Sequence, residues 1–442
     1  MKRVKQRAFS AYIFAGLLIL GLAVYMARYF SDGNLWAVSR INRGAYSDGI
    51  LKGGLLADRD GEFLASSSGG VYRYADDYAV RVSSLHVVGD YGGNIGTGAL
   101  RAFSPELLGY SPIGGTYSRD GLSNPVKLTI DAELQVAARN ALAGRRGAVL
   151  VMDYTNGEII CMVSSPSFDP VSPPNLALPE YEGAYINRTI SSKFTPGSVF
   201  KLVTLAAAIE NIGGLNSKKF TCTGSTVVDG REVKCSGVHG EQTIELAFAN
   251  SCNPAFAQIS VELGADVLER YTRALGLLDG HGIDGIPTTY GEITPGKDGS
   301  SELAWSGIGQ SKNLISPYAM LRLSAAIANG GVLPDGHLLL KKSGSGGNVR
   351  LLKAETAKAI ADMMSYNVAY SYGKWNFPNL DIHAKTGTAE VGDKPPHAWF
   401  VGFLNDAVHP YAFTVMVENG GGGLSAAGPV ANAVLQAAVK DD

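Results

Sequence analysis

Three short strings, spread along the chain, carry side chains that together could catalyse acyl transfer. They are Ser198-Val199-Phe200-Lys201, Ser251-Cys252-Asn253 and Lys385-Thr386-Gly387. A serine hydroxyl can attack a carbonyl carbon, a neutral lysine amine can accept its proton, and a charged lysine can bind a carboxylate. We therefore predict catalytic roles for five residues: Ser198, Lys201, Ser251, Asn253 and Lys385.

The first string is expected at the start of a helix. Thr195 can cap the helix, and Pro196 suits its first position, where no N–H is required. An apolar run continues to Ile209, so Ser198 lies in the first turn and Lys201 follows on the same face. A lysine in apolar surroundings loses hydration, which lowers its pKa and favours the neutral amine that can act as a base.

The second string follows a helix-like segment, residues 243–250, and is ended by Pro254, because the residue before a proline avoids the α region. From there Ser251 could pass a proton between Lys201 and the leaving group. The Asn253 amide could hold both the lysine and a substrate carbonyl.

The third string precedes two segments rich in aromatic and β-branched residues, 398–403 and 411–417, which predict strands. We therefore expect residues 385–388 to form an edge strand that lines a cleft. Gly387 would let a substrate backbone approach this strand closely.

Substrate binding is assigned to the same strand, at Thr386, Gly387 and Thr388. Lys385 and the Thr386 hydroxyl could bind a carboxylate. The backbone N–H groups of Ser198 and Thr388 could form an oxyanion hole.

Each string also has an ordinary structural interpretation. The first suits a capped core helix with a surface serine and lysine, the second a simple helix end, and the third an exposed strand edge protected by a lysine. What favours an acyl-serine site is the joint occurrence of all three strings, in this order and each in its required local context.

Flanking segments carry a resemblance to a known family. They are a hairpin around Asn156-Gly157 (residues 147–163), Asp58-Arg59-Asp60-Gly61, Gly307-Ile308-Gly309-Gln310 and residues 397–403. Together with the three strings, they resemble class B penicillin-binding proteins, which are penicillin-binding transpeptidases of the penicilloyl-serine transferase superfamily. The resemblance is strong over roughly residues 126–440 and patchy before them.

The resemblance implies a mixed α/β fold: a five-stranded antiparallel sheet flanked by helices, with an all-helical lobe that carries Ser251 and Asn253. The chain itself indicates strands, then helices, then strands and a terminal helix, which agrees. We expect four parts: a cytoplasmic tail (1–7), a transmembrane anchor (8–28), a short, mostly β pedestal region (29–125) and the transpeptidase domain (126–442).

The anchor is predicted from nineteen uncharged residues, Ala8 to Met26, which just span a bilayer core of about 30 Å. Basic residues before them predict a cytoplasmic N-terminus and an extracytoplasmic domain: Lys2, Arg3, Lys5 and Arg7. The rival interpretation is a cleaved signal peptide, but Tyr25-Met26-Ala27 is a poor cleavage site.

The four cysteines need a separate interpretation. Cys222 and Cys235 are a candidate disulfide, because exported thiols are usually oxidised. A zinc site built from these two and His239 would lack a fourth ligand, so no metal is predicted. Cys161 and Cys252 are expected to be packing residues, and the seven histidines form no cluster in the sequence.

The function expected is a penicillin-sensitive D,D-transpeptidase that cross-links peptidoglycan stem peptides through an acyl-serine intermediate, without a cofactor. Its expected partners are stem peptides, β-lactams as covalent inhibitors, the membrane and, as the resemblance implies, a multi-pass glycan polymerase. A net charge of −2 without a basic patch argues against nucleic acid. The alternatives are a D,D-carboxypeptidase or β-lactamase using the same site, and a non-catalytic β-lactam receptor or scaffold.

Overall fold

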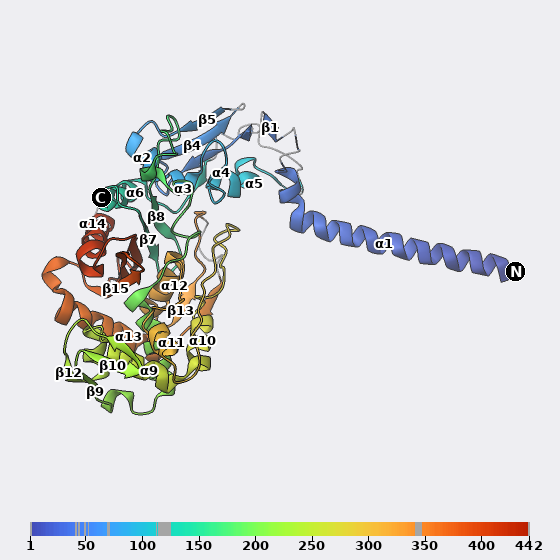
Figure 1. The fold of residues 1–442 in the computed structure, drawn as a ribbon. Coiled ribbons are helices and arrows are strands. Elements are labelled where there is room, and N and C mark those ends of the chain that lie inside the picture. The colour runs from blue at the N-terminus through green and yellow to red at the C-terminus, as the bar shows by residue number, and fades with distance from the viewer. Residues whose placement is uncertain are drawn as a thin grey trace.

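A long N-terminal helix projects from the rest of the molecule (Figure 1). The computed structural model describes residues 2–39, 42, 45–47, 50–51, 53–68, 71–111, 113, 125–340 and 347–440. Helix α1 (Lys2–Ala37) is long and apolar enough to cross a membrane over residues 3–37, and its 18-residue apolar stretch has a mean hydropathy of 2.1 and no buried residue. The apolar helix expected from the sequence is therefore present, and it extends past the predicted anchor.

The large domain is built on a five-stranded antiparallel sheet, as predicted. In sheet order its strands are β15 (Ile382–Val391), β16 (Lys394–Leu404), β17 (Tyr411–Val417), β7 (Gly147–Asp153) and β8 (Ile159–Ser165). Because β15 pairs with a strand on one side only, the third string lies on a sheet edge.

Helices cover both faces of this sheet. Alternate residues of β7 point to opposite faces: Val149 and Val151 pack in the core beneath α6 (Ala132–Leu142) and α14 (Gly428–Ala438). Leu150 and Met152 pack in the core on the other face, which contains α12 (Pro317–Ala328). Both faces are therefore buried, which explains why these strands are almost continuously apolar.

A lobe beside the sheet carries most of the remaining helices: α7 (Lys201–Asn211), α8 (Ile244–Ala249), α9 (Asn253–Leu263), α10 (Ala265–Ala274), α11 (Ser301–Gly307) and α13 (Ala354–Asn367). The expectation of an all-helical lobe needs a correction. Two antiparallel strand pairs lie between α7 and α8: β9 (Phe220–Cys222) with β12 (Gly240–Gln242), and β10 (Ser225–Val228) with β11 (Arg231–Lys234).

The region after α1 contains a four-stranded sheet in the order β5 (Val71–Tyr74), β4 (Phe63–Ser68), β3 (Leu55–Ala57) and β6 (Val126–Lys127). It also holds a short strand pair, β1 (Tyr46–Ser47) with β2 (Ile50–Leu51), and four short helices: α2 (Tyr78–Ser83), α3 (Leu85–Val88), α4 (Ala99–Ala102) and α5 (Ser104–Leu107). The region is thus less purely β than expected. The expected boundary near residue 125 follows a segment, 114–124, outside the described residues.

A buried carboxylate joins this region to the large domain. Asp58 Oδ1 accepts hydrogen bonds from three backbone N–H groups of its own turn, at 2.8–3.0 Å. Its second oxygen, Oδ2, accepts one from Ala132 N at 3.1 Å, at the start of α6. The Asp58-Arg59-Asp60-Gly61 string therefore fixes a turn against the helix that supports the sheet.

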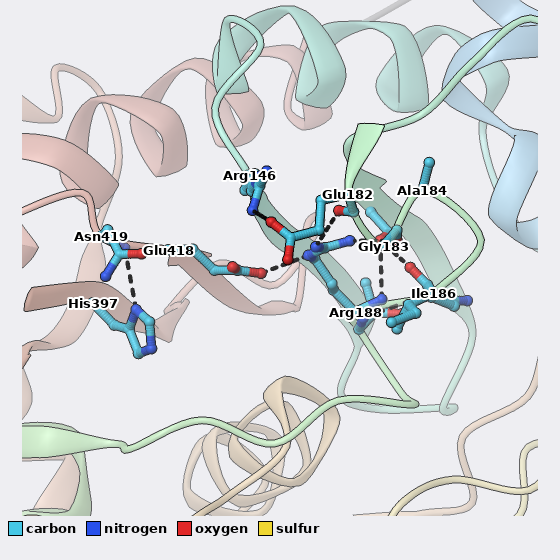
Figure 2. Close-up of polar contacts among 12 residues, drawn as sticks. Arg146, Glu182, Gly183, Ala184, Ile186, Arg188, His397, Glu418 and Asn419 are labelled. Atoms are coloured by element: carbon cyan, nitrogen blue, oxygen red, sulfur yellow. Dashed lines mark hydrogen bonds and ion pairs between the residues drawn. The ribbon is translucent and has the colours of Figure 1, made fainter. Parts of the chain in front are cut away.

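A second polar cluster anchors the segment that leads to the first string (Figure 2). The Arg188 guanidinium donates to Glu418 Oε1 at 2.5 Å and to the carbonyls of Gly183 and Glu182 at 2.8 and 3.2 Å. Glu418 directly follows β17, and its own N–H donates to the Arg146 carbonyl at 2.9 Å. The approach to Ser198 is thereby tied to the end of the sheet.

Candidate active site

The first string forms the tight turn η2 (Gly197–Phe200), which continues directly into α7. Thr195 does not cap the helix as expected, and its carbonyl instead accepts a hydrogen bond from Trp399 Nε1 at 3.0 Å. Gly197 adopts a φ of +56°, and its N–H donates to the Gly309 carbonyl at 2.8 Å. Contacts with the sheet and with a neighbouring loop therefore position Ser198, where a side-chain cap was predicted.

Lys201 is fully buried, and its ammonium contacts only neutral oxygens among its hydrogen-bond partners. Nζ donates to the Ser251 carbonyl at 2.6 Å, to Ser251 Oγ at 3.2 Å and to Asn253 Oδ1 at 2.8 Å. It also lies 5.5 Å from the centre of the Phe256 ring. Desolvation by burial lowers the pKa of Lys201 to about 8, so a larger fraction of this lysine is the neutral amine near neutral pH.

Lys385 is also fully buried, on the opposite side of the same serine. Its Nζ donates to Ser251 Oγ and to the Thr386 carbonyl, each at 3.1 Å. Burial holds the pKa of Lys385 well below its usual value, and repulsion from Lys201 lowers this pKa further by a smaller amount. The Lys385 side chain is 0% exposed, so it could act on a substrate carboxylate electrostatically and not by the direct contact expected from the sequence.

The Ser251 hydroxyl bridges the two lysines, at 3.2 Å from one Nζ and 3.1 Å from the other. Its backbone has a φ of +50°, an uncommon conformation for a residue other than glycine, and functional sites often store such strain. This geometry suits the predicted transfer of a proton through Ser251.

The position of Asn253 differs in one respect from the expectation. Its Oδ1 accepts from Lys201, as expected, while its Nδ2 also donates to the Lys234 carbonyl at 2.9 Å, a contact that the sequence does not suggest. Lys234 ends β11, in the inserted strand pair. The amide therefore also fastens that hairpin to the site.

A cavity of about 440 Å³ opens beside the half-buried Ser198, and five predicted site residues line it: Ser198, Ser251, Asn253, Thr386 and Thr388. A second cavity of about 830 Å³ shares three of them, Ser251, Thr386 and Thr388, and adds Tyr372, Phe377 and Leu424. The two cavities adjoin along β15, at the residues they share. Together they leave room for an extended substrate on both sides of Ser251.

Gly387 is needed for a different contact from the one expected. A Cβ at this position would lie 2.9 Å from the Pro196 carbonyl oxygen and 3.0 Å from Val199 Cγ1. A Cβ on Gly197 would in turn lie 2.8 Å from the Thr388 carbonyl oxygen. The two glycines let the nucleophile-bearing turn pack on β15, which brings the Ser198 and Thr388 backbones close together, as an oxyanion hole requires.

Sequence patterns did not single out one polar side chain of the site, Tyr372. This buried residue ends the π-helical turn η4 (Val368–Tyr372), and its hydroxyl accepts from Thr386 N at 3.1 Å and from Thr386 Oγ1 at 3.2 Å. Tyr372 reaches the strand because the helical turn that carries it lies next to β15, and no short sequence motif predicts that turn.

All four cysteines are free thiols in the structure, so the expected Cys222–Cys235 bond is absent from it. Cys161 is buried within β8, as predicted. The ligand atoms of Cys222, Cys235, His239 and Cys252 all lie within 4.8 Å of one another. The expectation that a fourth ligand is missing is therefore wrong, because Cys252 supplies it from the second string.

Comparisons with known proteins agree with this fold and site. A model of the penicillin-binding protein transpeptidase domain matches residues 147–436. The peptidoglycan D,D-transpeptidase PbpA of Mycobacterium tuberculosis is 29% identical, over 99% of both chains. Stage V sporulation protein D of Bacillus subtilis is 29% identical, over 74% of this chain and 54% of that one.

A solved structure shows the same likeness. The imipenem acyl-enzyme of penicillin-binding protein A from M. tuberculosis matches with a TM-score of 0.75 and 26% identity, over 88% of this chain and 98% of that one. The fold and the site define a serine acyl transferase of the penicillin-binding type. This chain belongs to the transpeptidase family and is a class B penicillin-binding protein.

Proposed function

We propose that this protein is a peptidoglycan D,D-transpeptidase and that Ser198 is its nucleophile. Ser198 Oγ attacks the penultimate D-Ala carbonyl of a stem peptide, and the neutral Lys201 amine takes the hydroxyl proton. The C–N bond breaks, and terminal D-Ala leaves with a proton relayed through Ser251. An amine from a neighbouring stem then attacks the ester, forms the cross-link and returns the proton to Ser198.

The observation that carries this proposal is the burial of Lys201 among neutral hydrogen-bond partners, in contact with Ser251 and Asn253. A lysine with an ion-pair partner would keep its proton, whereas this one is desolvated and can act as a base. Its place at the start of α7, one turn after Ser198, suits direct proton transfer.

Binding of the substrate would use the edge strand. Thr386 and Thr388 offer hydroxyls in the shared part of the two cavities. The buried Lys385 adds positive charge next to Ser251. The N–H groups of Ser198 and Thr388 would stabilise the oxyanion. The terminal carboxylate of the stem would then lie along β15.

The placement of the enzyme follows from α1. We propose that this helix crosses the membrane with its N-terminus in the cytoplasm, because Arg3, Lys5 and Arg7 precede the apolar stretch. The domain boundaries given above and a multi-pass glycan polymerase as partner belong to the same proposal. The relatives' peptidoglycan chemistry supports an extracytoplasmic domain, where stem peptides are joined.

Hydrolysis of the same acyl-enzyme is the second candidate function. The exposed carboxylates of Glu232 and Glu390 line the cavity beside Ser198, where they could activate a water molecule. A D,D-carboxypeptidase or a β-lactamase would use such a group.

The test is the product formed from a donor stem peptide and an amine acceptor. We expect a cross-linked dimer, and we expect labelled penicillin to attach to the wild type and not to Ser198→Ala. Ser192→Ala, a nearby serine outside the two cavity linings, is the matched control. Released D-Ala without dimer, lost in Glu232→Gln or Glu390→Gln, would establish hydrolysis instead.

A further inference from the structure

Four metal-binding side chains converge beside the proposed active site. Three of them, Cys222, Cys235 and His239, come from the strand pairs inserted between α7 and α8, and Cys252 comes from the second string. Each ligand atom lies within 4.8 Å of every other. Cys222 and Cys252 are buried, and Cys235 and His239 are partly buried. The cluster therefore brings the segment inserted between α7 and α8 next to the second string, and three of its four ligand atoms are sulfurs.

We propose that this cluster binds one zinc ion with a structural role. Three thiolates and one imidazole are a typical ligand set of closed, four-coordinate zinc sites, whereas magnesium and calcium prefer oxygen ligands. Tetrahedral coordination at ordinary bond lengths separates neighbouring ligand atoms by about 3.3–3.8 Å. Cys235 Sγ and His239 Nδ1 are 3.5 Å apart, which already fits.

The backbone holds the ligands in place through its own hydrogen bonds. Cys235 N donates to the Gly224 carbonyl at 2.8 Å, and His239 N donates to the Cys222 carbonyl at 3.2 Å. On the other side, Cys252 N donates to the Ala247 carbonyl at 2.8 Å. The ligands are thus gathered by the fold itself, so metal binding requires only small side-chain adjustments and the release of thiol protons.

The site would position two proposed catalytic groups. Cys252 stands between Ser251 and Asn253, which both contact Lys201. Next to Cys235, the Lys234 carbonyl accepts the Asn253 amide. Zinc would therefore hold the inserted hairpin and the second string together and maintain the strained backbone of Ser251. This positioning role rests on the proposed function, whereas metal binding itself does not.

The rival state of the cluster is the Cys222–Cys235 disulfide expected from the sequence. Zinc and the disulfide exclude each other, because both use the same two sulfurs. A disulfide would leave Cys161 and Cys252 as free thiols, and zinc would leave four thiols once the metal is removed. Thiol counting therefore separates the two states without any measurement of activity.

The experiment uses the full-length protein, purified in detergent without chelator or reductant. We expect about one zinc ion per chain by elemental analysis and four thiols after denaturation in EDTA. Cys222→Ser and His239→Ala should lose the zinc. His239→Cys should retain it, because four thiolates also bind zinc. Cys161→Ala, which removes a buried thiol outside the cluster, is the control and should keep the metal.

Three results would overturn the metal site. The first is two free thiols without zinc, which would establish the disulfide. The second is four thiols without zinc even after incubation with Zn²⁺. The third is zinc that persists in both Cys222→Ser and His239→Ala. Retention in His239→Cys guards against loss by misfolding alone.

Penicillin labelling then tests the positioning role. We expect His239→Ala to label at least about tenfold more slowly than the wild type, as loss of supporting groups around a metal typically costs. His239→Cys should recover most of the rate. Unchanged labelling in zinc-free protein would refute the positioning role and leave the metal site standing. A zinc-loaded wild type that penicillin never acylates would instead refute the proposed function.

Discussion

Among the residues that the structure describes, buried lysine and arginine side chains occur in two regions, and their partners differ. At the end of the sheet, the Arg188 side chain is 7% exposed and pairs with the carboxylate of Glu418, which is 16% exposed (Figure 2). At the active site, Lys201 and Lys385 are both 0% exposed, and their hydrogen-bond partners are neutral oxygens.

The difference separates a structural charge from a reactive one. A buried ion pair with further hydrogen bonds from carbonyls compensates the desolvation of both charges, so Arg188 fastens one segment to another. Neutral oxygens compensate only part of the desolvation of Lys201, so its pKa falls to about 8 and its proton becomes transferable. Two buried lysines without an ion-pair partner are therefore consistent with the proposed catalytic role of this site.

The most direct test of this difference between the two regions is the Lys201→Arg variant. Arginine keeps a cation but cannot supply a neutral base, because it stays protonated at all accessible pH values. We expect the rate of penicillin acylation to fall by about 1,000-fold or more, measured with labelled penicillin. Lys193→Arg, at an exposed ion pair with Glu292, is the matched control and should label normally. Substantial labelling of Lys201→Arg would show that the base lies elsewhere.

Removing the charge at the structural region should act on stability instead. Arg188→Leu leaves Glu418 buried without its partner, and we expect a loss of about 3–5 kcal/mol in the free energy of unfolding. The double variant Arg188→Leu/Glu418→Leu should recover part of that loss, because no unpaired charge remains. Denaturant unfolding of the purified protein measures both. Equal stability of the single and double variants would mean that the unpaired Glu418 carboxylate does not cause the loss.

Lys385→Arg should have a smaller effect than Lys201→Arg. Arginine keeps a positive charge near the Thr386 carbonyl, although its larger side chain fits the buried space next to Ser251 less well. We expect acylation to remain measurable, roughly 10–100-fold slower than in the wild type, at the lower end of general acid–base effects. If both arginine variants lost activity equally, the base and the carboxylate attractor would be misassigned.

Local patterns in the sequence predicted single strands and the three strings, whereas the five-stranded antiparallel sheet was expected from the family resemblance. The Asn156-Gly157 hairpin and the aromatic runs at 398–403 and 411–417 are each contained in one segment, so their period and turn residues predict strands directly. The start of α7 was predicted only in part, because its first turn is held by Gly309 and Trp399, which lie far away in the sequence.

Contacts between distant segments were beyond the sequence alone. The Asn253 amide on Lys234, the Tyr372 hydroxyl on Thr386 and the approach of Cys252 to the other cysteines all depend on how the inserted strand pairs fold back. Each of these residues has an ordinary local pattern, so nothing in its neighbours indicates the partner. The fourth zinc-type ligand was missed for this reason.

A pH dependence, which needs no substitution at the site, distinguishes the two regions. Since Lys201 must be neutral to accept a proton, the acylation rate of the wild type should rise about tenfold per pH unit below pH 8 and level off above it. The sign follows from burial, which lowers the pKa by disfavouring the charged form. Single-turnover labelling across about pH 6–10, at fixed ionic strength, measures the profile, and these limits lie about two units below and above the inflection. Arg188→Leu should show the same midpoint at a temperature where it remains folded, because its charge lies outside the reaction. A flat profile in the wild type, or a midpoint that shifts with Arg188, would mean that Lys201 is not the titrating base.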